Sequence, residues 1–406
     1  MINKRIKFNQ IRSSRKILIF TGWYPTPERP LDFSFVSQQV KIMKDALPKL
    51  SGEHWELIVW HEGLPLDFPN RFVRKISPKN FDWIDEGIKV RYRQSTILSH
   101  RLPFNQTFLV KNNLGKTYNE IIDFFGGEPD VVWTVTLSSA ILWDWFQKQN
   151  DFNVPFFLQE HSVPLSMHLK HKYKRRAAVQ LPNSLKEVVV VAERQVEEFK
   201  ALSANYNCKV IWNAVDPIFL NNPTNIPRKK TLLFVGRLSK QKGVERLLKA
   251  FSIVHRYDPE MNLKLIGNGE LEIKLKNLAH DLKLEDSVHF LGSKQPEEIA
   301  NFLEEANLFI LPSLYENCPV ALLEAQVKGV PCVIVKNGAS EKVLLPDNGI
   351  VVEDDGSGDQ LAIGIIDTLE RIDEFERETI RSKGVNAFAP EIFAAKMYEV
   401  ILETIN

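Results

Sequence analysis

Short apolar runs that alternate with amphipathic stretches fill most of this sequence, and this alternation is the feature that most constrains the fold. One series extends from residue 16 to residue 213, and a second extends from residue 231 to residue 353. Strands that alternate with helices assemble into mainly parallel sheets, because each helix carries the chain back across the sheet. Residues 221–230 (NNPTNIPRKK) are polar and contain prolines, as linkers do. The pattern predicts an α/β chain with two Rossmann-like domains.

The stretch from Leu308 to Val335 (LFILPSLYENCPVALLEAQVKGVPCVIV) predicts a strand, a short helix and a second strand. Pro319 suits the first helical turn, where its missing N–H costs nothing. Gly329 suits the position just past the last turn. The apolar residues at helical spacing predict a buried stripe formed by Val320, Leu323 and Val327.

This predicted helix offers several groups that could hold a nucleotide. Backbone N–H groups around Pro319, Val320 and Ala321 lack intrahelical partners and can bind a phosphate at the positive end of the helix. Glu324 lies a turn further in, where a carboxylate can accept hydrogen bonds from ribose hydroxyls. Glu316 lies in the loop before the helix and could accept from a sugar. Taken alone, Glu324 could equally be a tolerated edge carboxylate and Glu316 a solvated loop residue.

Two cations follow the first strand of the second series. Gly236-Arg237 ends that strand, and Lys242-Gly243 opens the next helix, which we expect from Val244 to Tyr257. Ligands of open parallel sheets bind beyond the carboxyl ends of the strands, so we expect both cations at that edge. Arg237 supplies a rigid fork and Lys242 a mobile point charge, which suits a diphosphate. Negative charge that develops on a leaving diphosphate would be stabilised there.

The motifs together resemble the large family 4 of retaining glycosyltransferases (glycosyl transferases group 1). This resemblance implies the GT-B fold, with two Rossmann-like domains facing each other across a cleft. The resemblance rests on E-x7-E between Pro-Ser and Gly-Val-Pro, on G-R-L…K-G at residues 236–243, and on Asn213-Ala214-Val215-Asp216-Pro217. It implies transfer of a sugar from a nucleoside diphosphate to an acceptor with retention at the anomeric carbon. It also implies that no metal or other cofactor takes part, and that the leaving phosphate helps to accept the acceptor's proton.

Two further site residues rest on this resemblance. Leu291, in Phe290-Leu291-Gly292-Ser293, matches a segment whose backbone meets the nucleotide base. His161 follows a strand of the first domain, as a cleft histidine of the family does, and a neutral imidazole there could orient the donor sugar. At the start of the first predicted helix, at residue 33, this sequence has a phenylalanine where family members have a glycine.

Composition excludes several other classes of protein. The net charge of +1 argues against a nucleic-acid partner, and no apolar run reaches the ~20 residues that span a bilayer. Three cysteines lack metal-ligand spacing and indicate free thiols in a reducing compartment. We therefore expect a cytoplasmic protein. The basic run HLKHKYKRR at residues 168–176 predicts a solvated helix face, with contact to the inner membrane surface or an anionic lipid acceptor as the alternative.

The predicted organisation is an acceptor-side domain over residues 1–220, a nucleotide-sugar-binding domain over 221–385, and a C-terminal helix over 386–406 that crosses back to the first domain. The predicted function is transfer to a glycan or lipid-linked acceptor in bacterial surface polysaccharide synthesis. A sugar-nucleotide epimerase with the same fold and a non-catalytic nucleotide-sugar-binding partner are the alternatives.

Overall fold

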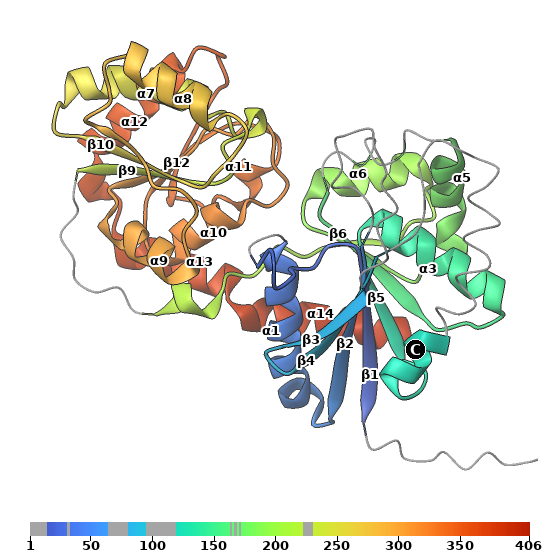
Figure 1. Cartoon of the computed structure of the whole chain (residues 1–406). Helices are drawn as coiled ribbons and strands as arrows, with labels where there is room; N and C mark the ends of the chain where they lie inside the picture. The colour runs from blue at the N-terminus through green and yellow to red at the C-terminus, as the bar shows by residue number, and fades with distance from the viewer. Residues whose placement is uncertain are drawn as a thin grey trace, which may run out of the picture. The chain divides into compact units, whose positions relative to one another are not determined.

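A computed structural model describes residues 14–30, 33–63, 80–94, 119–162, 165, 169, 172–221 and 230–406. The chain divides into two compact units (Figure 1). Unit 1 comprises Met1–Val189, Phe199–Lys209 and Ala394–Asn406, and unit 2 comprises Val190–Glu198 and Val210–Phe393. The predicted linker at 221–230 lies almost wholly outside the described residues, and the two predicted domain boundaries, after residues 220 and 385, stay predictions.

Unit 1 is built on an eight-stranded sheet with the order β3-β4-β2-β1-β5-β6-β7-β8. The strands are β1 (Arg15–Thr21), β2 (Trp55–Gly63), β3 (Asn80–Asp85), β4 (Ile88–Gln94), β5 (Val131–Val135), β6 (Phe156–Glu160), β7 (Val188–Val190) and β8 (Cys208–Val210). β1 pairs in parallel with both β2 and β5, as the alternation predicts. Its centre is fully buried, because helices cover both faces of such a sheet.

The alternation of apolar and amphipathic stretches does not predict strand β3. β3 pairs antiparallel with β4 at the edge of the sheet. Its sequence, NFDWID, alternates aromatic and polar residues, which is a period of two. The rings of Phe81 and Trp83 stack at 5.3 Å, and Phe81 also stacks on Tyr92 of β4 at 5.0 Å. The contact within β3 and the cross-strand contact with Tyr92 stabilise an edge strand that carries few aliphatic residues.

Unit 2 is built on a six-stranded sheet with the order β11-β10-β9-β12-β13-β14, and every pair in it is parallel. The strands are β9 (Thr231–Val235), β10 (Asn262–Ile266), β11 (Val288–Phe290), β12 (Leu308–Leu311), β13 (Cys332–Val335) and β14 (Gly349–Val352). Helices α7 (Val244–Tyr257), α8 (Glu272–Asp281) and α12 (Asp359–Glu370) cover one face, while α9 (Pro296–Glu305), α10 (Val320–Val327) and α13 (Arg377–Phe388) cover the other (Figure 1). The predicted helix at 244–257 is confirmed residue for residue.

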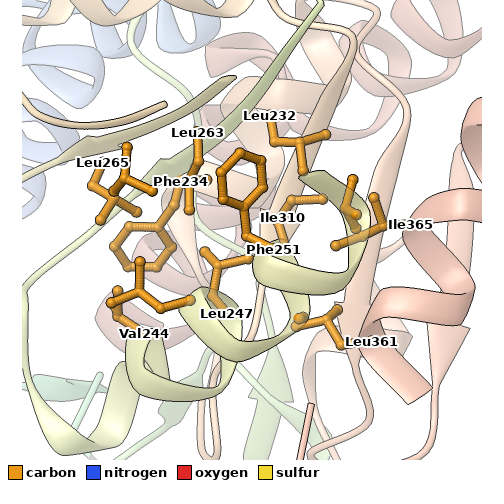
Figure 2. Packing of buried hydrophobic residues seen from close by; sticks show 14 of the residues in the cluster. Leu232, Phe234, Val244, Leu247, Phe251, Leu263, Leu265, Ile310, Leu361 and Ile365 are labelled. Carbon is orange, nitrogen blue, oxygen red and sulfur yellow. The ribbon is translucent and has the colours of Figure 1, made fainter. Parts of the chain in front are cut away.

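The core between this sheet and its first helical layer is aliphatic and aromatic. Leu247 and Phe251 of α7 meet Leu361 and Ile365 of α12 over Leu232 of β9 (Figure 2). These five side chains are at most 1% exposed. Burial of each such side chain stabilises a fold by roughly 1.5–3 kcal/mol, so this layer holds the sheet rigid beneath the loops at its edges.

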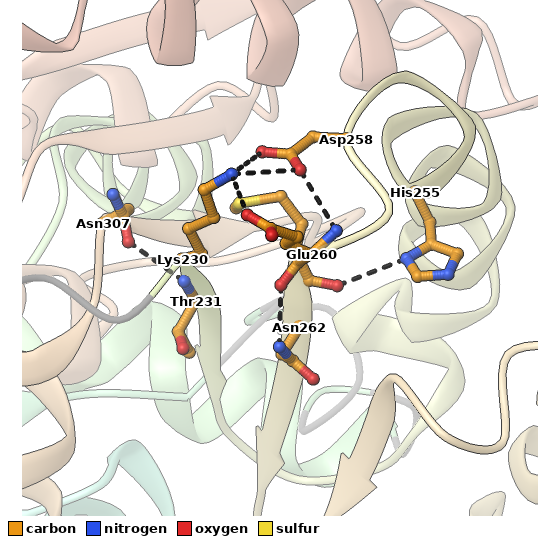
Figure 3. A network of polar contacts seen from close by, with 8 residues as sticks. Lys230, Thr231, His255, Asp258, Glu260, Asn262 and Asn307 are labelled. Carbon is orange, nitrogen blue, oxygen red and sulfur yellow. Dashed lines mark hydrogen bonds and ion pairs between the residues drawn. The ribbon is translucent and has the colours of Figure 1, made fainter.

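A polar network links the amino ends of strands in the same sheet (Figure 3). Lys230 Nζ lies 3.0 Å from Asp258 Oδ2 and 2.6 Å from Glu260 Oε2, which joins the residues before β9 to the turn before β10. The backbone N–H of Thr231 donates to Asn307 Oδ1 at 3.0 Å, just ahead of β12. The amino ends of three adjacent strands are thus tied to one another.

Among the residues that the structure describes, no helix is both long enough and apolar enough to cross a membrane. The C-terminal helix α14 (Pro390–Ile405) is assigned from Ala394 onward to unit 1, whereas the residues before it belong to unit 2. Of the basic run at 168–176, residues 172–176 lie on α5 (Lys172–Gln180), residue 169 lies before it, and residues 168, 170 and 171 lie outside the described residues.

Candidate active site in unit 2

The predicted donor-binding residues gather at the carboxyl edge of the sheet of unit 2. β9 lies between β10 and β12, and the chain extends the sheet first on one side of β9 and then on the other. Such a reversal creates a switch point, outside which open parallel sheets bind their ligands. Gly236 and Arg237 directly follow β9, and Glu316 lies in the loop that follows β12. The sequence therefore brings these groups to the one place in the sheet that favours a ligand.

A close backbone approach holds the Lys242 turn against the Glu316 loop. Gly243 has φ of 64°, and a Cβ built there would lie 2.0 Å from the carbonyl oxygen of Pro312. Only glycine fits this position. The two segments are also hydrogen bonded, because Leu314 N donates to Gln241 O at 2.9 Å and Gln241 Nε2 donates to Tyr315 O at 2.8 Å.

Glu316 is buried, with 5% of its surface exposed, so its interpretation as a solvated loop residue is wrong. Lys242 Nζ contacts its Oε1 at 2.5 Å, and Ser313 Oγ donates to the same oxygen at 2.7 Å. A buried carboxylate is costly unless a cation and hydrogen-bond donors satisfy it, and here both do. The loop after β12 thereby presents one carboxylate and one mobile ammonium group side by side.

Arg194 is a component of this site that the sequence analysis did not identify. It lies in the part of α6 (Glu193–Leu202) that belongs to unit 2. Its Nη2 and Nε donate to Asn317 Oδ1 at 2.7 and 3.0 Å, and its guanidinium lies 4.1 Å from the ring centroid of Tyr315. Tyr315 and Asn317 are the two neighbours of Glu316 in the chain, so Arg194 fixes the loop on both sides of the carboxylate.

Helix α10 begins at Val320, with Pro319 as its N-cap residue rather than in its first turn. No side chain caps the helix. The backbone N–H groups of Val320 and Ala321 therefore lie at an open, positively polarised helix end.

The predicted apolar stripe of α10 is wrong at Val320. Val320, Ala321 and Glu324 share the partly exposed face, while the remaining positions of the helix are buried: Leu322, Leu323, Ala325, Gln326 and Val327. The exposed face extends from the open helix end to the carboxyl group of Glu324.

The carboxyl group of Glu324 makes no hydrogen bond to any described residue. Burial, and secondarily the nearby carboxylate of Asp216, raise the pKa of Glu324 from its ordinary value to about 8. Its carboxyl group is therefore largely protonated at neutral pH in this structure. A ligand that offers hydroxyl groups would satisfy this group, because hydrogen bonds to the charged form favour ionisation.

Arg237 is exposed, and its guanidinium makes no hydrogen bond or ion pair within the described part of the chain. The turn before it is fixed, because Gly236 N donates to Ile266 O at 2.9 Å and a Cβ on Gly267 would lie 2.0 Å from Gly236 O. Leu291 follows β11 and is partly exposed, with its N–H donating to Leu265 O at 2.9 Å. Arg237 is thus an unpaired cation that follows a tightly held backbone turn.

His161 belongs to unit 1, where it directly follows β6. Its ring lies 4.9 Å from that of Phe35, at an interplanar angle of 61°. Burial lowers the pKa of His161 to about 3, so the imidazole is neutral at physiological pH. Its predicted contact with a donor sugar stays a prediction.

Two other kinds of chemistry find no support among the side chains of this region. Cys318 is buried, and burial raises the pKa of its thiol to about 12, which leaves no reactive thiolate. Within the described ranges, no three His, Cys, Asp or Glu side chains gather as a metal site.

Comparison with known proteins identifies the family. Residues 219–383 match the model of the family described as "Glycosyl transferases group 1". These residues form a group 1 glycosyltransferase domain. The match includes the predicted residues of unit 2, from Gly236 to Glu324.

Curated relatives agree with this assignment. An uncharacterized glycosyltransferase of Haemophilus influenzae is 36% identical over 126 residues, which are 30% of this chain and 35% of that protein. The amylovoran biosynthesis glycosyltransferase AmsK of Erwinia amylovora is 40% identical over 108 residues, which are 25% of this chain and 26% of that protein. The matches thus span only about a third or less of the length of these two relatives.

Solved structures show that the group 1 glycosyltransferase domain is part of a GT-B fold that extends over the chain. Sucrose-phosphate synthase from Thermosynechococcus elongatus has a TM-score of 0.71 with 18% identity, over 97% of this chain and 99% of that one. The lipopolysaccharide outer core galactosyltransferase WaaB in its apo form has a TM-score of 0.67 with 17% identity, over 95% and 99%. At these identities the likeness establishes the fold.

Proposed function

We propose that this chain transfers a hexosyl group from a nucleoside-diphosphate sugar to a glycan or lipid-linked acceptor, with retention at the anomeric carbon. The observation that supports this most strongly is the convergence at the switch point of unit 2. A free arginine, a lysine–glutamate pair and an open helix end lie together there, within the segment that matches the family.

In this proposal the chain's own cations stabilise the leaving group. As the bond to the sugar breaks, negative charge develops on the diphosphate. Arg237 binds it as a rigid fork, and Lys242 turns from Glu316 toward it. The N–H groups of Val320 and Ala321 bind the phosphate at the positive helix end. With two cations and a helix end, the site needs no metal ion, and we propose a metal-independent reaction.

The two glutamates have separate roles in the same proposal. Glu324 accepts hydrogen bonds from the ribose hydroxyls, while Glu316, released by Lys242, accepts from the donor sugar. Leu291 and Gly236 contact the nucleotide, and His161 orients the sugar. The leaving phosphate accepts the acceptor's proton, so no protein base is required.

The names of relatives and structural neighbours suggest the biological setting. They include a GDP-mannose-dependent mannosyltransferase of Corynebacterium glutamicum, an alpha-monoglucosyldiacylglycerol synthase of Streptococcus pneumoniae, and a protein solved with UDP-glucose. We propose a role in bacterial surface polysaccharide synthesis, in the cytoplasm, with peripheral contact to the inner membrane surface and without a nucleic-acid partner.

A nucleotide-release screen tests the proposal. Purified protein is incubated with UDP-, GDP- and ADP-sugars, with and without EDTA, and the free nucleoside diphosphate and the anomeric configuration of any product are measured. We expect release from one nucleotide class, unaffected by EDTA, and lost in Arg237→Ala. Release that requires added metal would contradict the metal-independent mechanism. Isomerised donor without transfer would identify an epimerase instead.

A further inference from the structure

We propose that an aromatic cluster at the carboxyl edge of unit 1 binds the acceptor as a pyranose ring packed against the outer side of the stacked Trp23–Phe33 pair. This deepens the proposed function, on which it rests, because it names a carbohydrate as the acceptor's recognised part. The cluster consists of Trp23, Phe33, Phe35 and His161, and all four belong to unit 1.

The register of the sheet places these residues together. Thr21 of β1 pairs with Val135 of β5, and Val135 pairs with Gln159 of β6. Trp23 and His161 each stand two residues beyond that row. β1 lies between β2 and β5, so the sheet reverses its direction of growth between β1 and β5. The aromatic cluster therefore lies at the switch point of unit 1, the same kind of position that the nucleotide residues occupy in unit 2.

The four rings contact one another in sequence. Trp23 stacks on Phe33 with centroids 4.9 Å apart and an interplanar angle of 13°. Phe35 meets Trp23 edge-on at 6.4 Å and 85°, and it contacts His161 at 4.9 Å. Phe33 is 38% exposed although it is a large apolar side chain. Aromatic surface left open at a ligand-binding edge is typical of a binding site rather than of a core.

The backbone beneath the cluster is held in conformations that its residues rarely adopt. Phe33 has φ of 54° at the N-cap of α1 (Ser34–Ser51), where glycine would be favoured, and Thr136 after β5 has φ of 80°. Such strain persists where the surrounding structure enforces it, and it clusters at functional sites. The backbone of Trp23 is also fixed, because its backbone N–H donates to Thr21 Oγ1 at 2.8 Å. The stacked pair is thus built in advance of any ligand.

The chemistry of the cluster favours a pyranose over a lipid chain. One face of a pyranose presents C–H bonds with partial positive charge, which pack well on the negative face of an aromatic ring. Its hydroxyl groups need polar partners at the rim, and the imidazole of His161 lies beside the rings. An acyl chain would need a larger, uniformly apolar surface. In this proposal Phe33 supplies an aromatic ring at a position where the resembled family has a glycine, which has no side chain to offer.

Saturation-transfer NMR with methyl hexopyranosides tests the assignment without knowledge of the natural acceptor. The probes are the methyl α- and β-glycosides of glucose, galactose and mannose, and the variants are Trp23→Leu, Phe33→Leu and Trp23→Phe. We expect saturation of ring protons of at least one glycoside by the wild type and by Trp23→Phe. We expect binding at least about tenfold weaker in both leucine variants, the scale of a lost aromatic contact.

Phe124→Leu is the matched control. Phe124 is a partly buried aromatic of unit 1 that contacts Arg91 at 4.0 Å, and it lies in the segment that ends beside Lys16, at the amino end of β1. This variant should bind glycosides as the wild type does. Calorimetry with UDP, GDP and ADP on the same samples reports the nucleotide site separately and should be unchanged by all four variants.

The outcomes separate the two proposals. Equal glycoside binding by wild type and both leucine variants would overturn the aromatic assignment. Nucleotide binding without any glycoside binding would overturn it as well, as would binding to phospholipid vesicles alone. Glycoside binding that depends on Trp23 and Phe33, with no affinity for any of the three nucleotides, would support the cluster and overturn the proposed function.

Discussion

Lys242 Nζ lies 2.5 Å from Glu316 Oε1, so the mobile cation of the unit 2 site and its buried carboxylate neutralise each other. The side chains are 22% and 7% exposed. A diphosphate would compete with Glu316 for Lys242, and the carboxylate would then be free to accept from the sugar. On the proposed function, the pair would therefore link arrival of the leaving group to release of the Glu316 carboxylate.

The first prediction concerns this pair. Lys242→Met should lower the free energy of unfolding by up to about 3 kcal/mol, because it leaves the Glu316 carboxylate buried without its cation. Lys242→Met combined with Glu316→Gln should recover most of that loss, since the buried charge is gone. Denaturant unfolding measures both. Lys336→Met, which breaks the exposed Lys336–Glu353 pair in the same unit, should have no measurable effect. Strictly additive losses in the double variant would show that the two residues are not coupled.

Arg237 should act on the reaction and not on the fold. Arg237→Ala should lower turnover by at least about a hundredfold, the scale for a lost donor to a developing oxyanion. Its thermal midpoint should not change, because the guanidinium is exposed and makes no hydrogen bond or ion pair with the described chain. Arg371→Ala, an exposed arginine of α12's C-terminal end that pairs with Glu374, is the control and should turn over normally. Normal turnover by folded Arg237→Ala protein would remove Arg237 from the mechanism.

Arg194 should position the Glu316 loop without contact to the nucleotide. Arg194→Lys keeps the charge but loses the fork on Asn317 and the flat contact with Tyr315. We expect kcat to fall by about tenfold or more with the donor from the nucleotide screen, while the affinity for free nucleoside diphosphate stays unchanged. The control is Arg256→Lys, at an exposed position of α7. A loss of nucleotide affinity equal to the loss in kcat would instead place Arg194 in the nucleotide site.

The basic face of α5 allows a fourth prediction. Lys172, Arg175 and Arg176 are exposed, whereas Lys174 is partly buried and burial lowers its pKa. If this face meets an anionic membrane, vesicle binding should rise with the anionic lipid fraction and fall with salt, at up to about 1 kcal/mol per exposed cation.

Replacing Lys172, Arg175 and Arg176 by glutamine should abolish that vesicle binding. The control replaces Lys274 and Lys276 of α8, which are paired with Glu245 and Glu272, and should bind as the wild type does. Equal vesicle binding by the α5 variant and the wild type would leave α5 as a solvated face.

Local sequence patterns predicted the helices that bury only one face. The amphipathic period of α7 gave its bounds, since only one face of that helix meets the sheet. The period failed for α10, because this helix is buried on two faces. Gly384 of α13 comes so near that an added Cβ would lie 2.8 Å from the carbonyl carbon of Gln326. No single stripe exists in a helix that packs between a sheet and another helix, and Val320 was misplaced for that reason.

The site shows the same division between local and long-range information. The cations and carboxylates could be found, since they follow strand ends or open a helix, and parallel sheets bring those ends to one edge. The contact of Arg194 with Asn317 spans 123 positions of the chain and leaves no local signal. The pair between Lys242 and Glu316 could not be foreseen either, because it depends on the approach of Gly243 to Pro312.

A further prediction separates the two glutamates by nucleotide affinity. Glu324 lies on the open face of α10, so Glu324→Gln should weaken binding of the free nucleoside diphosphate as well as of the donor. In the proposed site Glu316 meets the sugar and competes with the phosphate for Lys242, so Glu316→Gln should cut transfer sharply without weakening nucleoside diphosphate affinity. Calorimetry with the nucleotide alone, beside turnover, measures both. The opposite pattern would reverse the two roles.

Glu324 also predicts a pH dependence of stability whose sign is fixed by its pKa. Because the folded-state pKa of about 8 lies above the ordinary value of 4.5, the folded chain holds a proton that the unfolded chain has lost between these values. The favourable contribution is complete below pH 4.5 and is lost as pH rises through about 8. Glu324→Gln keeps the shape without the ionisation, so its melting temperature should match the wild type near pH 5 and exceed it at pH 8.5.

Nucleotide binding should release the proton that the Glu324 carboxyl group holds in the folded chain. Hydroxyl groups that donate to Glu324 favour its ionised form, so binding near pH 7 should release a proton from this carboxyl group. Calorimetry in buffers of different ionisation enthalpy measures the number of protons released. The release measured with Glu324→Gln gives the contribution of the nucleotide phosphates, which is subtracted from the wild-type value. Asp216→Asn, which removes the second cause of the raised pKa and can still cap its short helix, should reduce the release. Identical proton release by wild type and Glu324→Gln would show that this carboxyl group does not meet the nucleotide.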